Sequence, residues 1–364
     1  MDPSKFSALS LDDSEHDIHY AMNLVTSSVL PMILGSAIDL GILDILDAHG
    51  PGAKLSPYQI ASELKAGHPE APSMIDHMLC LLASHSILTC SVEADATGSG
   101  CHRFYGLAPV ARYFTKNSGR GSLGSWMLMV QHKVVLNSWF NLKEAVMDGG
   151  FPFEMTHGAT ANKYFAEHPP LFDDFRSSAK DFNKLIMVRI LDTYSGFEGI
   201  NLLIDVGGGD GSVLNTILSK YPSMRGINYD LPPVIENCPS YERIEHIPGS
   251  MLSGVPKGDA ILIKWVLHSW DDEHFLKVLN NCYTALPSEG KVIVIDMVIP
   301  ESPEPSPLTQ NIFQFYLHVK TMNPRRIERT AREFENLAKG AGFSGICIPT
   351  CAYNFSVIEF LKNK

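Results

Sequence analysis

The most constraining feature of this sequence is an alternation of short apolar runs and helical segments that begins after Gly199. Segments with helical periodicity, such as EHFLKVLNNCYTAL, separate the apolar runs LLIDV, GINYD, AILIKWVLH and KVIVIDMVI. Parallel strands that are buried on both faces have such runs, and crossover helices connect them. We therefore expect an α/β domain with a doubly wound, mostly parallel, Rossmann-like sheet.

A glycine-rich turn, DVGGGDG at residues 205–211, joins the first run to the helical segment that follows. Glycines in such a turn let the backbone approach a ligand at a helix N-terminus. A dinucleotide fingerprint that starts at Gly207 needs Gly or Ala at position 212, where this chain has Ser212. Asp230 ends the next run about 20 residues later, which suits ribose hydroxyls. The pattern favours a nucleoside-type cofactor over a dinucleotide.

Composition limits the partners of this chain. Its 364 residues are 45% hydrophobic, enough for two domains, and its formal net charge of -11 offers no basic surplus for nucleic acid. We therefore expect a small-molecule partner. The acidic start MDPSKFSALSLDDSEHD is unlike a secretory signal, and no apolar run approaches the ~18 residues of a membrane span. The expectation is a cytoplasmic protein without membrane contact.

The seven cysteines do not have the spacing of metal ligands. We therefore expect free thiols that are mostly buried, with Cys101 exposed.

The amino-terminal region has the pattern of a winged helix. Residues 17–48 are apolar on more than one side, with an expected interruption at Pro31, which predicts burial against a partner subunit. A helix should start at Ser56, a third follows in SMIDHMLCLLASHS, and ILTCSV, ADATGSG and CHRFYGL form a hairpin. Residues 71–90 contain no Lys or Arg, which argues against DNA binding and for dimerisation. We place the dimerisation domain at 1–115 and the α/β domain at 116–364, with a helical segment at about 116–198.

Three ionisable residues are candidates for proton transfer. His268 directly follows the run AILIKWVL, Asp296 ends KVIVIDMV, and Glu328 lies in RRIERT. In open α/β sheets, ligands bind beyond the carboxyl ends of the strands. A histidine held by carboxylates keeps one tautomer and a raised basicity, so His268 is a candidate general base, with Asp296 at the same edge of the sheet.

The chain resembles plant small-molecule O-methyltransferases of the caffeic acid O-methyltransferase type. The resemblance lies in the blocks DVGGGDG, YDLPPVIE, GSML, KWVLHSWDDE, NCYTALPSEGKVIVID, NPRRIERT and EFENLAKGAGF, in the family's order and spacing. It implies S-adenosylmethionine-dependent methylation of a phenolic hydroxyl without a metal, and a homodimer formed through the amino-terminal domain. By analogy, His268 is the base and Asp296 and Glu328 bracket it.

The resemblance also implies the binding residues. The implied cofactor contacts are Gly207, Asp230, Leu231, Ser250, Met251 and Lys264, with Trp270 near the adenine. The implied acceptor pocket contains Met129, Val130, Val135, Ala161, Phe165, Leu171, Phe175, Ala179, Phe182, His318, Val319 and Asn323. Val130, Phe165 and Phe182 occupy positions where monolignol-methylating relatives have an Asn and two His. We expect a bulky acceptor with few free hydroxyls, such as a lignan, a benzylisoquinoline-type alkaloid or a methoxylated flavonoid.

Two positions depart from the family pattern. Ser250 stands where relatives usually have an Asp that faces the adenine amino group, so one charge-assisted hydrogen bond is missing. Ser269 replaces the Asp of H-D-W, which bears on acceptor choice. These serines leave open a second interpretation, an inactive dimeric binding module of the same fold, which the retained His268 argues against. A third interpretation, a nicotinamide-dependent dehydrogenase, is disfavoured because the glycine spacing does not match the dinucleotide fingerprint.

Overall fold

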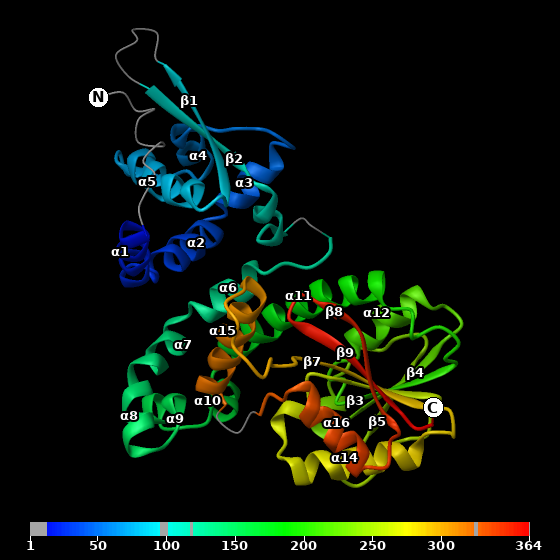
Figure 1. Cartoon of the computed structure of the whole chain (residues 1–364). Helices are drawn as coiled ribbons and strands as arrows, with labels where there is room; N and C mark the ends of the chain where they lie inside the picture. The colour runs from blue at the N-terminus through cyan, green and yellow to red at the C-terminus, as the bar shows by residue number, and fades with distance from the viewer. Residues whose placement is uncertain (1–12, 95–100, 117–118, 324–326, 364) are drawn as a thin grey trace. The chain divides into compact units, whose positions relative to one another are not determined.

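The computed structural model describes residues 13–94, 101–116, 119–323 and 327–363 (Figure 1). It consists of two compact units, Met1–His132 and Lys133–Lys364, each of which is described by itself. The tip of the predicted hairpin turn at 95–100 and Pro324 lie outside the described residues. The boundary near residue 115 stays a prediction.

The amino-terminal unit contains six helices and a hairpin within its described residues. The helices are α1 (Asp13–Val25), α2 (Val29–Asp39), α3 (Ile42–Ala48), α4 (Pro57–Glu63), α5 (Ala71–Ser84) and α6 (Gly124–Val130). Strands β1 (Leu88–Ala94) and β2 (Cys101–Leu107) pair antiparallel, as predicted, and the 3-10 helix η2 (Pro109–Tyr113) follows. Ser56 caps α4 in a complete capping box.

The expected interruption at Pro31 is wrong. The first helix ends at Val25, and Pro31 lies inside α2, at its third residue. Proline is tolerated in the first turn of a helix because the N–H groups there have no intrahelical partner. The break therefore falls three to five residues before the proline.

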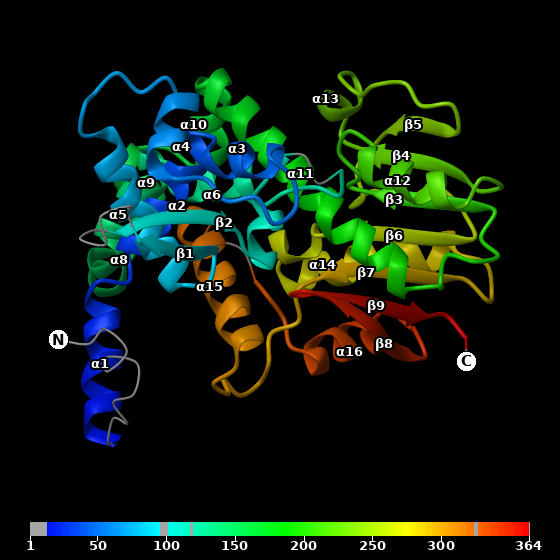
Figure 2. The ribbon, with the colours of Figure 1, turned by 90° about the horizontal axis from the view of Figure 1, so that it is seen from above.

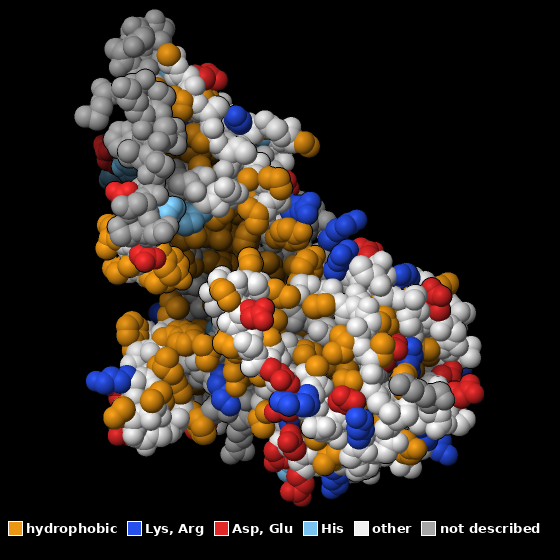
Figure 3. All heavy atoms as spheres, in the orientation of Figure 1, with side chains coloured by type: hydrophobic (Ala, Val, Ile, Leu, Met, Phe, Trp, Pro, Cys, Tyr) orange, Lys and Arg blue, Asp and Glu red, His pale blue; other side chains and the backbone are white. Residues whose placement is uncertain are grey.

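Helices α1 and α2 expose an unusual amount of apolar surface. Ile18, Met22, Leu24 and Val25 of α1 are each more than half exposed, and Val29 and Met32 of α2 are nearly so. Hydrophobic side chains are visible over this part of the unit in Figure 3. In the described part of the chain, no helix alone is long and apolar enough to cross a membrane; only the pair Glu15–Val25 and Val29–Asp39, bent by 49°, passes that test, by length and composition.

The carboxy-terminal unit is built on a seven-stranded sheet, whose order is β5-β4-β3-β6-β7-β9-β8 (Figure 2). The strands are β3 (Leu202–Val206), β4 (Arg225–Asp230), β5 (Ile244–Pro248), β6 (Ala260–Lys264), β7 (Lys291–Asp296), β8 (Gly345–Ala352) and β9 (Phe355–Leu361). Strands β3 to β7 pair in parallel, and β9 pairs antiparallel with both β7 and β8. The predicted mostly parallel sheet is confirmed.

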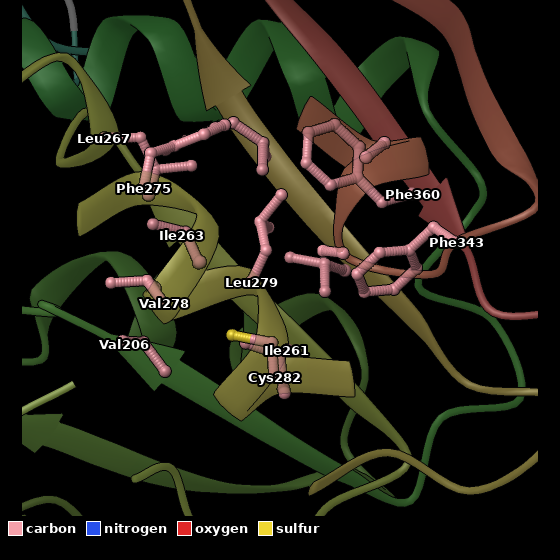
Figure 4. Packing of buried hydrophobic residues seen from close by; sticks show 14 of the residues in the cluster. Val206, Ile261, Ile263, Leu267, Phe275, Val278, Leu279, Cys282, Phe343 and Phe360 are labelled. Carbon is pink, nitrogen blue, oxygen red and sulfur yellow. The ribbon is translucent and has the colours of Figure 1, made fainter. Parts of the chain in front are cut away.

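Helices cover both faces of the sheet, α11 (Pro169–Thr193) and α12 (Ser212–Lys220) on one and α14 (Asp272–Ala285) and α16 (Ala331–Gly340) on the other (Figure 1). Phe275, Val278 and Leu279 of α14 pack against Ile261 and Ile263 of β6 (Figure 4). These side chains are completely buried, which explains why the apolar runs do not alternate with polar residues.

The remaining elements of this unit are mostly short helices. They are α7 (Lys133–Ser138), η4 (Trp139–Asn141), α8 (Leu142–Asp148), α9 (Pro152–His157), α10 (Ala161–Glu167), α13 (Pro232–Ile235), η5 (Leu267–Ser269) and the longer α15 (Pro307–Met322).

All seven cysteines are free, but the prediction that most are buried is wrong, because only Cys282 is buried. Cys101 is exposed as expected, and so are Cys90, Cys347 and Cys351. The last two lie on β8, an edge strand that has a neighbour on one side only.

Candidate active site

The glycine turn lies between β3 and α12, at the carboxyl edge of the sheet. Gly207, Gly209 and Gly211 all have φ between +58° and +78°, the left-handed region that favours glycine. A Cβ atom added to Gly207 would lie 2.8 Å from Cγ2 of Val266 and 3.3 Å from Cε of Met251. Position 207 therefore accepts glycine alone, and the turn contacts the segments that follow β5 and β6.

Asp230, the last residue of β4, is bonded to this turn. Its Oδ2 accepts a hydrogen bond from the N–H of Gly209 at 2.9 Å, and its Oδ1 accepts one from the N–H of Leu231 at 2.7 Å. The hydroxyl of Tyr229 donates to the carbonyl of Ser250 at 3.1 Å. The turn, the end of β4 and the loop after β5 therefore meet at one edge of the sheet, as the sequence predicts for a ligand site.

Lys264 and Trp270 are the other two candidate cofactor residues. Lys264 ends β6, and its Nζ donates a hydrogen bond to Oδ1 of Asn183 on α11. Burial lowers the pKa of Lys264 to about 8, although the charges of Asp296 and Asp205 oppose this shift. Trp270 is half-buried and stacks on His274, with ring centroids 5.4 Å apart.

His268 lies in η5, four residues after β6 ends, and faces two carboxylates. Its Nδ1 is 3.5 Å from Oδ1 of Asp296, the last residue of β7, and 3.9 Å from Oε1 of Glu328. The side chains of all three residues are at most 2% exposed. Oδ1 of Asp296 also accepts a hydrogen bond from the N–H of Met297 at 2.9 Å, which fixes its orientation.

This arrangement suits proton transfer. Carboxylates beside Nδ1 favour the tautomer with the proton on that nitrogen, which leaves Nε2 as a proton acceptor. The three residues also offer ligand atoms within 4.8 Å of one another, a spacing that could hold a metal ion. The structure therefore brings together the three residues proposed from the sequence as the catalytic group.

An aromatic cluster surrounds one side of His268. The ring of Trp265 lies edge-on to the imidazole, with centroids 5.5 Å apart, and contacts Phe315 and Phe355 at the same centroid distance. Phe182 of α11 stacks on Phe315 of α15 at 5.6 Å. The predicted pocket residue Phe182 therefore belongs to a cluster that touches the candidate base.

Sequence reasoning missed three members of this cluster, namely Trp265, Phe315 and Phe355. Trp265 has φ of +54°, which is rare for a bulky residue and re-aims its side chain at the end of β6. The only available signal was its position one residue after the strand and three before His268. Phe315 and Phe355 are ordinary aromatic residues of a helix and a strand, and nothing local distinguishes them.

The other candidate pocket residues lie on the helical elements. Phe165 and Phe175 stack on each other at 5.2 Å, and Phe165 is buried against Phe153 in a separate small cluster. Val319 is buried on α15, and Asn323 is the C-cap that follows the last residue of this helix. Met129 and Val130 end α6 of the amino-terminal unit. Their roles in acceptor binding stay predictions.

Comparison with known families identifies the family to which this fold belongs. The model of the O-methyltransferase domain matches residues 139–344, more than half of the chain. The chain belongs to the O-methyltransferase family. A second model, the O-methyltransferase dimerisation domain, matches residues 22–117. The predicted family, the fold class and the enzyme class are therefore confirmed.

Several plant enzymes are similar over nearly the whole chain. Caffeic acid 3-O-methyltransferase of Medicago sativa is 48% identical, with 97% of this chain and 96% of the relative covered. Caffeic acid 3-O-methyltransferase 1 of Populus tremuloides is 49% identical, with 96% of each covered. O-methyltransferase 13 of Lophophora williamsii is 48% identical, with 94% of each covered.

Solved structures with low sequence identity share the fold. Human N-acetylserotonin methyltransferase, in complex with S-adenosylmethionine, has a TM-score of 0.78 at 21% identity, with 98% of this chain and 99% of that chain covered. A methyltransferase of calicheamicin biosynthesis, in its S-adenosylhomocysteine-bound form, has the same TM-score at 20% identity, with coverages of 96% and 99%.

Proposed function

We propose that this enzyme transfers a methyl group from S-adenosylmethionine to a phenolic hydroxyl, with His268 as the general base. The observation that carries the proposal is the buried imidazole of His268, whose Nδ1 lies between Asp296 and Glu328. It adjoins the glycine turn through Val266, which contacts Gly207. A candidate base and a glycine turn, whose backbone a ligand can approach closely, thus lie at one edge of the sheet.

The residues at the turn fit a nucleoside cofactor. A Cβ on Gly209 would meet nothing within 4 Å, so the turn has open space there, and the carboxylate of Asp230 lies beside the turn with the acceptor capacity that ribose hydroxyls require. S-Adenosylmethionine supplies a methyl group on a positively charged sulfonium, so the reaction needs no metal to activate it. We propose Leu231, Ser250, Met251, Lys264 and Trp270 as the further contacts.

His268 acts at the phenolic oxygen. A free phenol has a pKa of roughly 10 and histidine one of roughly 6.5, so complete deprotonation before transfer is unfavourable. Nε2 instead takes the proton as the oxygen–methyl bond forms and the carbon–sulfur bond breaks. Asp296 and Glu328 stabilise the imidazolium that results, because two negative charges face its Nδ1–H.

We propose an acceptor with a large aromatic body and few free hydroxyls. Phe182, which stacks on Phe315 and lies next to Trp265, offers aromatic surface. Its ring has no hydrogen-bond donor for a carboxylate group of the acceptor. A buried apolar wall favours an acceptor with a large apolar area. Lignans, benzylisoquinoline-type alkaloids and methoxylated flavonoids meet this description.

Transfer of a labelled methyl group from S-adenosylmethionine to a mixed acceptor panel tests both parts of the proposal. The panel contains caffeic acid beside lignans, flavonoids and alkaloid phenols, and the His268→Ala enzyme is the control. We expect a bulky member to be methylated first in competition, and this methylation to be lost in the control. Preference for caffeic acid would overturn the acceptor class, whereas bound cofactor with no transfer would favour the inactive binding module.

We further propose that the enzyme is a homodimer that buries the exposed apolar side chains of α1. Leu24 and Val25 are 55% and 84% exposed, and such a concentration of apolar surface marks an association site. Sedimentation velocity should give about twice the 40.1 kDa chain mass for the unaltered protein. Leu24→Asp with Val25→Asp should give the monomer mass, and an unchanged dimer would contradict the assignment.

A further inference from the structure

Arg329 is the residue next to Glu328, and it is among the largest fully buried side chains in the described part of the protein. Its side chain is only 2% exposed, which is unusual for a charged residue. A guanidinium in such a place needs its N–H donors paired, because an unpaired buried charge is strongly unfavourable. The partners of Arg329 therefore indicate what it holds.

The guanidinium of Arg329 bonds to the backbone on both sides of His268. Its Nη1 donates to the carbonyl of Leu267 at 3.3 Å, and its Nη2 donates to the carbonyl of Trp270 at 2.8 Å. The same side chain donates through Nε and Nη2 to Oδ1 of Asp272, at 3.0 and 2.7 Å. Two contacts thus hold the turn that carries His268, and two hold Asp272, the first residue of α14.

Backbone contacts join the same two segments. The N–H of Ile327 donates to the carbonyl of His268 at 2.8 Å, and the N–H of Ile299 donates to the carbonyl of Arg329 at 3.0 Å. The guanidinium also lies over the ring of Phe275, 4.7 Å from its centroid, which sets its plane. These contacts hold segment 327–329 between the η5 turn, which carries His268, and the residues that follow β7.

We propose that Arg329 is a positioning residue, which sets the distance between the His268 imidazole and the Glu328 carboxylate by tying the η5 turn to segment 327–329. The planar fork of arginine can bond two carbonyls and a carboxylate at once, whereas the ammonium of lysine acts as a point charge. Glu328 faces the imidazole ring of His268, and Arg329, the next residue in the chain, binds the backbone of the turn that carries His268. This inference rests on the proposed function, in which His268 is the base.

Three variants and one control separate positioning from charge and from folding. Arg329→Lys keeps a positive charge without the fork, and Arg329→Met keeps apolar contact with Phe275. Asp272→Asn removes only the charged partner, whose side chain is 70% exposed, and leaves the bonds to the carbonyls. The control is Arg332→Met, which removes a guanidinium from the surface, where it pairs with Glu301 at 3.1 Å and is 72% exposed.

The readouts are kcat and KM per folded site, with sites counted by titration with S-adenosylhomocysteine well below the melting temperature. We expect Arg329→Lys and Arg329→Met to lose about tenfold to a hundredfold in kcat, because a misplacement near 1 Å costs about that much. KM for the acceptor should change less than threefold. Asp272→Asn should stay within about threefold of the unaltered enzyme, and Arg332→Met should match it.

The outcome distinguishes the inference from the function on which it rests. A purely structural Arg329 would lower the melting temperature while folded sites keep their kcat, and that result overturns the inference. If Arg329→Met does not fold, Arg329→Lys decides, since it retains charge and most of the volume. Full activity of His268→Ala would refute the proposed base itself; an inactive His268→Ala with fully active Arg329 variants would refute only the positioning role.

Discussion

Replacement of Asp205 by asparagine should stabilise the catalytic unit, increasingly so as the pH rises. Asp205 lies in β3, is 1% exposed, and its Oδ2 has no hydrogen-bond partner among the described residues. Burial raises its pKa from 3.8 to about 7, and Asp230 and Asp210 add to the shift while Lys264 opposes it. The side chain therefore prefers to be neutral in the folded state.

The sign and size of the effect follow from proton binding. Between pH 3.8 and about 7, the folded protein holds a proton that the unfolded chain releases, so the free energy of unfolding falls as the pH rises. At 1.36 kcal/mol per pH unit, burying this carboxyl costs roughly 1.6 kcal/mol at pH 5, where the folded protein keeps it protonated, and roughly 4.3 kcal/mol at pH 8, where it is ionised. An asparagine never ionises and avoids this cost.

A local contact adds to the expectation. A Cβ on Gly208 would meet Oδ1 of Asn228 at 2.2 Å and Oδ2 of Asp205 at 2.6 Å, so both oxygens face the same side of the turn, and neither has a donor among the described groups. The amide of an asparagine at 205 supplies N–H donors on this side of the turn, which an ionised aspartate lacks.

Urea unfolding at pH 5, 6, 7 and 8 checks this prediction, with Asp192→Asn as a control that removes an exposed carboxyl of α11. The stability difference between Asp205→Asn and the unaltered protein should grow by about 2.7 kcal/mol from pH 5 to pH 8. A difference that is the same at every pH would refute the reasoning, because the cost would then not come from ionisation.

Three further substitutions probe the cofactor site and the pocket. Gly207→Ala should weaken binding of S-adenosylhomocysteine at least tenfold by calorimetry, because its Cβ would lie 2.8 Å from Val266 on a backbone with φ of +73°; unchanged affinity would contradict a close approach at this turn. Ser250→Asp should tighten the same binding by roughly fivefold, since a charged acceptor makes a stronger hydrogen bond, and no gain would remove Ser250 from the adenine site. Phe182→His should raise the competition of caffeic acid against a bulky acceptor by about tenfold, and an unaltered preference would exclude Phe182 from acceptor choice.

The sequence predicts the fold well where structure is local or follows from the edge of a sheet. The capping box at Ser56 and the apolar runs of β3 and β6 depend on neighbours a few residues away. The meeting of His268 and Asp296 was also predictable, since they lie at the carboxyl ends of parallel strands that are adjacent in the sheet. Glu328 joined them through the family resemblance and not through any periodicity.

The remaining features depend on contacts between distant segments. Phe182, Trp265, Phe315 and Phe355 come from four elements, and no pattern in the sequence indicates that their rings meet. Arg329 has the composition of a surface residue, and only the carbonyls of the η5 turn explain its burial. The role of such a residue can be recognised only from the tertiary structure, which shows the distant backbone groups that its side chain binds.

The most direct test of the account is the single-turnover rate of methyl transfer by His268→Gln, with enzyme in excess over a methyl acceptor and saturating S-adenosylmethionine. A general base contributes about a hundredfold or more, so the rate should fall at least that far while the affinity for S-adenosylhomocysteine stays as in the unaltered enzyme. A rate within threefold of the unaltered enzyme would contradict the assignment of His268 as the base.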